Sequence, residues 1–261
     1  MKNAKIIKVG IGALLAAFLF GVNVNAQEET EASSNFDIGA DYVSRYVWRG
    51  IQLGGPSPHV QPWMEYSFGE SGLAVGFWGS YSTGSDGTGN EADVYVTYAP
   101  NDMFSLTVTD YFFPGGGFPS GLSYFDYETD YAEGILPNHT IEVMATGSFG
   151  DFYLTAAVNV YGFDGYTLND DGEASQMYAK YVEAGYSLSD NIDVFVGGSL
   201  DDPDEEDGEV GFYGNAMGLT NIGISFAKDI SVTDKFTLPV SSSFIVNPMQ
   251  EELFLVFGLS L

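Results

Sequence analysis

The sequence predicts an all-β fold, an antiparallel up-and-down transmembrane β-barrel of about 12 strands behind an N-terminal signal peptide. Three observations predict it. Apolar residues alternate with small or polar ones over stretches of about ten residues. Short and long connections alternate strictly between these stretches. The N-terminus has the pattern of an export signal.

The first 26 residues predict export. Lys2, Lys5 and Lys8 precede an apolar run of about fourteen residues, and small residues follow it up to Ala26. A membrane anchor is the weaker interpretation, because a spanning helix needs a longer run. We therefore expect a cleaved signal peptide over 1–26, a short linker over 27–35 and the barrel over 36–261.

The composition excludes several classes of partner and chemistry. The chain has a formal net charge of −28, and without residues 1–26 five basic residues face 36 acidic ones. Such a surface repels polyanions, so nucleic acid is not an expected partner. Without cysteine there is neither a disulfide framework nor thiolate chemistry. No motif indicates a cofactor, and no later stretch is apolar for long enough to form a spanning helix.

Strand periodicity recurs along the rest of the chain. In 72–82, for example, Leu73, Val75, Phe77 and Tyr81 share one face of a strand. The predicted strands are 36–49, 58–68, 72–82, 91–99, 103–113, 139–149, 152–162, 176–188, 191–200, 220–229, 234–245 and 252–261.

The connections give the topology. Five of them are tight turns, at 69–72, 100–103, 150–151, 189–191 and 231–234. The longer loops are near 50–57, 83–90, 114–138, 163–175, 201–219 and 246–251. In an up-and-down barrel this alternation puts all turns at one end and all long loops at the other, as in outer-membrane barrels. We expect both termini at the periplasmic end.

A soluble sandwich or a lipocalin-like barrel is the alternative fold. Its outer face would need charges, whereas the faces here are either apolar and aromatic or small and weakly polar, which suits contact with outer-membrane lipid. The last strand, ELFLVFGLSL, resembles the C-terminal signal that outer-membrane assembly machinery reads. It ends in Leu261, where an aromatic residue is usual.

Both arginines of the chain, Arg45 and Arg49, lie in DYVSRYVWRGIQ at the start of the barrel. Strand alternation puts them on the inner face with Asp41, since an arginine facing mid-bilayer lipid costs about 2–4 kcal/mol. The returning strand brings Glu65 close to Asp41 and Arg45. Three interpretations stay open: a buried network of compensating charges, a constriction that orients a solute, and a surface position for Arg49.

Further inward acids are predicted at Glu142, Glu183 and Asp193. A lumen lined in this way favours neutral or cationic small solutes over anions. Twelve strands lie between small barrels filled by their own side chains and broad porins, so the expected pore is narrow. Loop 114–138, with aromatic and acidic residues, is the candidate for a lid or an inward-folding constriction loop.

Loop 201–219 opens with DDPDEEDGE, which holds seven acids in nine residues. The spacing does not fit an EF-hand, so a solvated acidic loop is the favoured interpretation. Loose divalent-cation binding is the alternative. Its weak candidate ligands are Asp201, Asp202, Asp204 and Glu205.

No catalytic site is predicted, and we expect no enzymatic activity. The histidines are His59, on an inner face, and His139, on an outer one. Lipid hydrolases of the outer membrane use a serine and histidine pair on the lipid-facing surface. No serine stands two positions after His139, on the same strand face.

The stretch DYVSRYVWRGIQLGGPSPHVQPWMEY resembles the opening of the TorF-like family of exported porins of Gram-negative bacteria. The matching residues are Asp41, Tyr42, Arg49 and Gly50. The resemblance covers about twenty-five residues and implies an outer-membrane barrel of porin type with no assigned substrate.

Two functions remain open on the sequence. The first is a narrow porin-like channel for small neutral or cationic solutes in the outer membrane of a Gram-negative bacterium. The second is a non-conducting structural or binding barrel whose acidic extracellular loops contact cations, the envelope or a partner.

Overall fold

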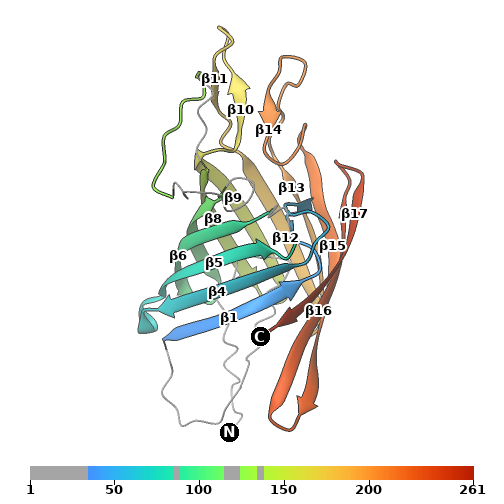
Figure 1. The fold of residues 1–261 in the computed structure, drawn as a ribbon. Helices are drawn as coiled ribbons and strands as arrows, with labels where there is room; N and C mark the ends of the chain where they lie inside the picture. The colour runs from blue at the N-terminus through green and yellow to red at the C-terminus, as the bar shows by residue number, and fades with distance from the viewer. Residues whose placement is uncertain (1–34, 85–88, 115–123, 134–137) are drawn as a thin grey trace.

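The computed structural model describes residues 35–84, 89–114, 124–133 and 138–261 (Figure 1). The predicted signal peptide, 1–26, lies outside the described residues, and so does the predicted linker except for residue 35. Within the described residues, no helix is both long enough and apolar enough to span a membrane.

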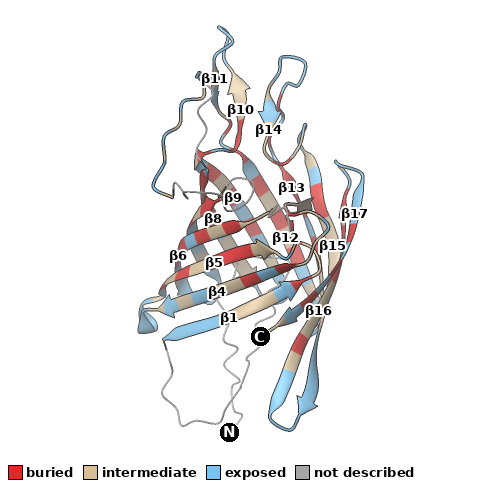
Figure 2. Ribbon diagram, in the orientation of Figure 1, coloured by how far each residue is buried: buried red, intermediate tan, exposed pale blue. Residues whose placement is uncertain are grey.

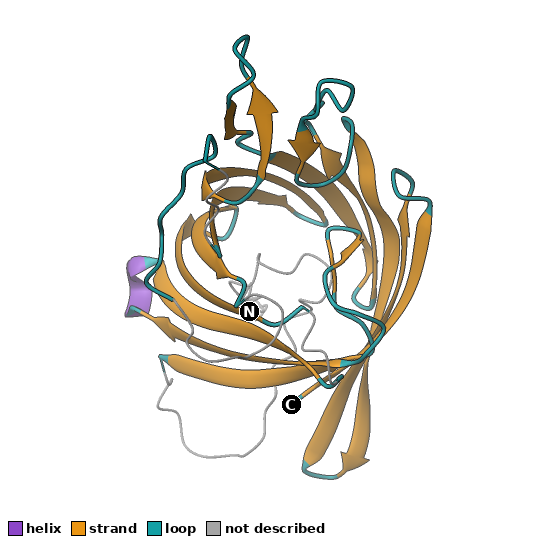
Figure 3. Cartoon of the chain, turned by 45° about the horizontal axis from the view of Figure 1, so that its top comes forward, coloured by secondary structure: helices purple, strands orange, loops and turns teal. Residues whose placement is uncertain are grey.

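Twelve strands of the described chain form a closed antiparallel barrel, which confirms the predicted fold (Figure 3). Each strand pairs with its neighbours in the chain, and the ring closes because β1 pairs with β4 on one side and with β17 on the other. The wall strands are β1 (Phe36–Val43), β4 (His59–Ser67), β5 (Leu73–Ser82), β6 (Glu91–Asn101), β7 (Phe104–Phe112), β8 (His139–Phe149), β9 (Phe152–Gly162), β12 (Lys180–Ser189), β13 (Ile192–Ser199), β15 (Gly218–Thr233), β16 (Phe236–Asn247) and β17 (Glu252–Ser260).

The ends of the barrel differ as the connections predicted. The tight turns, one of which contains the 3-10 helix η1 (Gly69–Ser71), lie at the end where the chain leaves β17 (Figure 1). The opposite end carries the long loops with three short strands, β10 (Gly165–Leu168), β11 (Ala174–Gln176) and β14 (Val210–Gly211), which pair as a small sheet above the wall.

The two faces of the wall follow strand alternation (Figure 2). Along β7, Phe104, Leu106 and Val108 are exposed, whereas Thr107 and Thr109 on the opposite face are buried. Near the tight turns the outward face carries a girdle of exposed aromatic rings. We call it the aromatic girdle: Phe36, Tyr66, Phe68, Tyr98, Phe104, Phe149, Phe152 and Tyr186.

The seam between β1 and β17 is short. Its register joins Asp41, Tyr42 and Val43 to the last strand, and Ala40 adds two backbone hydrogen bonds with Leu261 at 2.9 and 3.0 Å. The β1 and β4 pairing, by contrast, spans all eight residues of β1. The outward leucines and phenylalanine of β17 are 39–59% exposed, as the alternation in that strand predicted.

The first strand is shorter than predicted. We expected a strand over 36–49, but β1 ends at Val43, and the chain then leaves the wall as a hairpin of β2 (Val47–Trp48) and β3 (Ile51–Gln52). Strand alternation therefore does not determine where the two arginines point. The contacts of residues 44–57, called the inward segment below, determine it instead.

Candidate functional site

The inward segment turns at Arg49 and Gly50. Val47 pairs with Gln52 and Trp48 with Ile51, so Arg49 and Gly50 form a two-residue hairpin turn. Both have positive φ angles, 50° and 79°. This is the backbone of a type I′ turn, for which glycine at the second position is favoured because it has no Cβ.

Gly50 rests against the barrel wall. A Cβ on this residue would lie 1.8 Å from the backbone oxygen of Thr220 in β15. The side-chain amide of Asn247 in β16 donates to the Gly50 carbonyl at 3.0 Å. The tip of the hairpin is therefore fixed against the inside of β15 and β16, and only glycine fits there.

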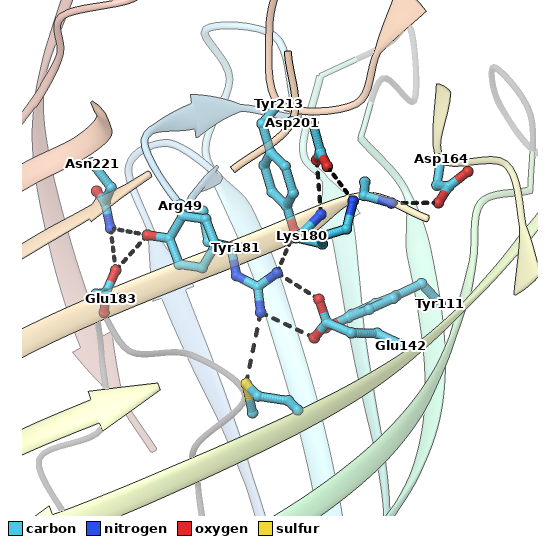
Figure 4. A network of polar contacts seen from close by, with 12 residues as sticks. Arg49, Tyr111, Glu142, Asp164, Lys180, Tyr181, Glu183, Asp201, Tyr213 and Asn221 are labelled. Carbon is cyan, nitrogen blue, oxygen red and sulfur yellow. Dashed lines mark hydrogen bonds and ion pairs between the residues drawn. The ribbon is translucent and has the colours of Figure 1, made fainter. Parts of the chain in front are cut away.

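The Arg49 side chain reaches a different part of the wall (Figure 4). Its guanidinium donates to both carboxylate oxygens of Glu142 in β8, at 2.5 and 3.0 Å, and to the hydroxyl of Tyr213 at 2.5 Å. It also lies 4.5 Å from the ring centre of Tyr181 in β12 and 4.4 Å from that of Trp48. A forked pair with a carboxylate between aromatic faces is the geometry that guanidinium favours.

The partners of Arg49 are themselves held in place. Tyr111 in β7 donates to Glu142 at 3.0 Å, and the Glu142 side chain is 1% exposed. Tyr213, in the loop before β15, stacks on Trp48 with ring centres 5.8 Å apart. Burial raises the pKa of the Tyr213 phenol, although Arg49 acts in the opposite direction, so this phenol is neutral at neutral pH.

The near side of the inward segment is anchored as well. Tyr46 donates to the buried carboxylate of Glu91 in β6 at 2.6 Å. Its ring lies 5.6 Å from those of His59 in β4 and Trp78 in β5. The segment thus touches inner-face residues on β4, β5 and β6 and, through Arg49, on β8 and β12. It therefore crosses the lumen from one wall to the other.

The six lumen residues predicted from the sequence do not form a single cluster in the structure. Arg49 and Glu142 meet, as described above. Arg45 instead donates to Gln52 within the hairpin at 2.8 Å. The predicted proximity of Glu65 to Asp41 and Arg45 was wrong.

The pairing register of β1 explains why Glu65 lies away from Asp41 and Arg45. Asp41 is opposite Gln61 and Ser260, whereas Glu65 is opposite Asp37 and accepts a hydrogen bond from Tyr95 at 3.1 Å. Arg45 cannot reach either acid along the wall, because the chain has left β1 two residues earlier.

Glu183 in β12 belongs to a neighbouring network on the inner face (Figure 4). It accepts hydrogen bonds from Tyr153, Tyr181 and Asn221 at 2.6–2.8 Å. Because Tyr181 also lies against Arg49, this network supports one aromatic face of the arginine pocket without touching the charge.

The candidate constriction loop 114–138 lies differently from the expectation. Its described part, residues 124–133, is called the outer segment here, and it runs along the outside of the barrel (Figures 1 and 3). Tyr127 stacks on His139 with ring centres 4.0 Å apart and donates to Asp110 at 2.7 Å. Asp110 and His139 are on the outward face, as alternation with Val108 requires. Residues 115–123 and 134–137 lie outside the described residues.

His139 has both ring nitrogens engaged. Nδ1 lies 2.8 Å from a carboxylate oxygen of Asp110, and Nε2 lies 2.6 Å from the backbone oxygen of Tyr124. His59 lies with Nδ1 2.9 Å from the hydroxyl of Ser80, and both residues are fully buried. This contact between serine and histidine joins β4 and β5. The spacing of residues along a single strand therefore could not predict it.

The acidic loop 201–209 forms turns. Asp201 accepts hydrogen bonds from the ammonium of Lys180 at 2.9 Å and from its backbone nitrogen at 2.7 Å. Asp204 accepts from two backbone nitrogens of its own turn, and Asp202 from that of Met217. In the described part of the chain no three histidine or acidic side chains come together as a metal site. The Glu205 carbonyl accepts a hydrogen bond from the backbone nitrogen of Gly208.

One family model and several solved structures are similar to this chain. A family model described as "Bacterial protein of unknown function (Gcw_chp)" matches residues 27–190. No curated protein matches the chain. Similar solved structures include the NanC porin in a rhombohedral crystal form, at TM-score 0.46 and 9% identity over 86% of this chain and 98% of that one.

Two other solved structures are similar over comparable lengths. The KdgM porin has a TM-score of 0.41 and 8% identity over 85% of this chain and 95% of that one. An anion-selective porin from Comamonas acidovorans has a TM-score of 0.29 and 11% identity over 86% and 95%. These scores are low, and the closed strand pairing of the chain itself establishes the barrel.

Proposed function

The chain belongs to the Gcw_chp family of bacterial proteins of unknown function, and we propose that it is a narrow porin-like channel of the bacterial outer membrane for small neutral or cationic solutes. The observation that carries the proposal is a closed barrel with an apolar outer face and a polar inner one. Closure gives every wall strand a hydrogen-bonded neighbour on both sides, so that the sheet has no unpaired edge strand to expose to lipid.

The outer face supports the membrane location. The aromatic girdle lies near the tight turns, and the outward face beyond it includes exposed aliphatic side chains, such as Leu106 at 47% and Val108 at 41%. Aromatic rings at the interface and aliphatic residues beyond them are typical of the lipid-facing surface of an outer-membrane barrel. With the tight turns at the periplasmic end, both ends of the barrel chain are periplasmic, and assembly by the outer-membrane machinery follows from this location.

The inner face supports the choice of solute. Between the inward segment and the tight turns, the described inner wall carries hydroxyl groups, such as the paired Thr97 and Thr107, and several carboxylates. The carboxylates are Asp37, Asp41, Glu65, Glu183 and Asp193. No described lysine faces this wall: Lys180 pairs with Asp201, Lys228 shares the outward side with Phe226, and Lys235 is in a turn. The unbalanced negative charge favours cations.

Reversal potentials in planar bilayers under a salt gradient test the selectivity. We expect cation preference, and a smaller preference when Glu65 is replaced by glutamine. A preference for anions would overturn the proposed solute class. Before that, a heat-dependent shift on a detergent gel tests the membrane barrel, since a soluble β protein would dissolve without detergent and show no shift.

One observation favours a second candidate function. The inward segment is fixed to the lumen wall at Glu91 in β6 and Glu142 in β8, and farther round the ring at Asn247 in β16. A barrel whose lumen stays blocked would be a structural or binding barrel whose acidic loops contact cations, the envelope or a partner. Silence of well-folded protein in bilayers, together with silence of a variant lacking the Arg49 side chain, would favour this second function.

A further inference from the structure

The pocket that holds Arg49 is built mainly by the wall and not by the inward segment. Glu142 and Met144 come from β8, Tyr181 from β12, and Tyr213 from the loop before β15. Of the groups around the guanidinium, only Trp48 is on the hairpin itself. If the hairpin moved, most of the pocket would therefore remain in place.

The wall groups form a receptor for a planar cation. Glu142 offers two carboxylate oxygens side by side, and Tyr111 holds one of them in position. The faces of Tyr181 and Tyr213 lie 4.5 and 5.8 Å from the charge. A carboxylate fork between aromatic rings selects guanidinium over a compact ammonium, which cannot form the paired hydrogen bonds.

Asn159 is an independent sign that this pocket can take a ligand with more polar atoms than Arg49 presents. It is on the inner face of β9, fully buried, and directly opposite Glu142 in the strand register. Neither its amide nitrogen nor its amide oxygen has a hydrogen-bond partner among the described residues. Buried amides of this kind are almost always satisfied, so the carboxylate has a free donor and acceptor beside it.

We propose that this pocket is a guanidinium-binding site on the lumen wall, that Arg49 occupies it as a built-in ligand, and that solutes bearing a guanidinium group compete with Arg49 and release the inward segment. Glu142 rejects anions, and the acidic inner wall concentrates cations at the pocket. The opening of a passage by release of the inward segment rests on the proposed channel function, whereas binding of a guanidinium group to the pocket does not.

Methylguanidinium and the Arg49→Gly protein in detergent micelles test the binding. Glycine tolerates the positive φ of this position, and removal of the side chain empties the pocket. We expect a saturable rise in melting temperature and a saturable change in tryptophan fluorescence with methylguanidinium. N-methylurea, which has nearly the same shape and no charge, should produce neither. Arg49→Asn, which also suits the turn, replaces the glycine variant if that one does not fold.

Two further substitutions in the Arg49→Gly background locate the site. Glu142→Gln should weaken methylguanidinium binding about tenfold or more, since a charge-assisted pair is lost. Asp126→Asn, which removes an exposed carboxylate of the outer segment, should leave binding unchanged. An equal response to N-methylurea, or binding that is insensitive to Glu142→Gln, would overturn the proposed site.

Bilayer recordings of the unaltered protein separate the two proposals. If both the channel and the guanidinium site exist, methylguanidinium increases the open time of the channel and choline does not. Binding in micelles without conductance in any variant would contradict the channel and leave the site standing. Conductance without binding in micelles would contradict the site and leave the channel standing.

Discussion

The inward segment and the outer segment take opposite positions on the barrel wall. Each holds tyrosine and charged side chains, basic in the inward segment and acidic in the outer one, and each is tied down by a charged contact near a tyrosine. One crosses the lumen, and the other lies on the outside of the wall. The side of the wall that bears the partner decides the difference: Glu142 faces inward, whereas Asp110 and His139 face outward.

A loop's own composition therefore does not predict whether the loop forms a constriction. The aromatic and acidic loop 114–138 was the better candidate by length, yet the shorter 44–57 enters the lumen. An arginine in a barrel lumen needs a buried carboxylate as its partner. A two-residue turn at the tip of a hairpin can place the arginine beside a carboxylate on another part of the wall.

The largest effect is expected from Glu142→Gln. It leaves the Arg49 guanidinium buried without its counter-charge, which costs about 3–5 kcal/mol when a buried pair loses one partner. We expect the inward segment to detach and trypsin to cleave after Arg49, measured by mass spectrometry of the intact barrel. Glu183→Gln, which removes a buried carboxylate that does not touch Arg49, should leave the segment protected. Protection of Arg49 in the Glu142→Gln protein would contradict the anchoring role.

Next in size is Gly50→Ala. A Cβ here meets the Thr220 oxygen, and the residue has a positive φ angle of 79°. Gly172 has the same φ with nothing within 4 Å, so Gly172→Ala reports the backbone strain alone, about 1 kcal/mol. We expect a clearly larger loss of unfolding free energy for Gly50→Ala, measured by thermal unfolding in micelles. Equal losses would mean that the hairpin tip does not rest on β15.

The outer segment should respond to Asp110→Asn with a smaller effect. The carboxylate accepts from Tyr127 and lies against His139, and loss of one charged hydrogen bond costs about 1.5–3 kcal/mol before solvent screening. We expect faster hydrogen exchange over 124–131 and unchanged conductance. Asp126→Asn, at an exposed position of the same segment, is the control. A changed conductance would place the outer segment in the pathway.

The smallest effect is expected from Arg45→Ala. Among the described residues Arg45 hydrogen-bonds to Gln52 alone, at a half-buried position, and this contact contributes about 1 kcal/mol or less. Conductance and melting temperature should stay close to those of the unaltered protein, while Arg49→Gly changes both. If the two arginine variants behaved alike, the hairpin would act through its charge and not through the Glu142 contact.

The local sequence pattern was sufficient to predict which side of a wall strand faces outward. Residues two apart on a strand share a face, so the alternation at Leu253, Leu255 and Phe257 identified the outward side of β17 without any knowledge of its neighbours. The inward direction of Glu142 and Glu183 followed in the same way, and the alternation of turns and loops gave the order of the strands.

The arginine pocket could not be predicted in the same way. Arg49 and Glu142 are 93 residues apart, and Arg49 and Tyr213 are 164 apart. Their meeting depends on where each strand stands in the closed ring. The turn at Arg49 and Gly50 was not predicted, because Tyr46 and Trp48 keep the two-residue spacing of the apolar face of the first strand.

Most strands, their faces, the asymmetry of the barrel ends and the shortage of positive charge could be predicted, because each depends on neighbouring residues or on composition alone. The entry of residues 44–57 into the lumen, the position of 124–133 outside it and the pairing of Arg49 with Glu142 could not. Those outcomes depend on which buried charges and backbone atoms face each other across a closed ring, and closure brings together residues that are distant in the chain.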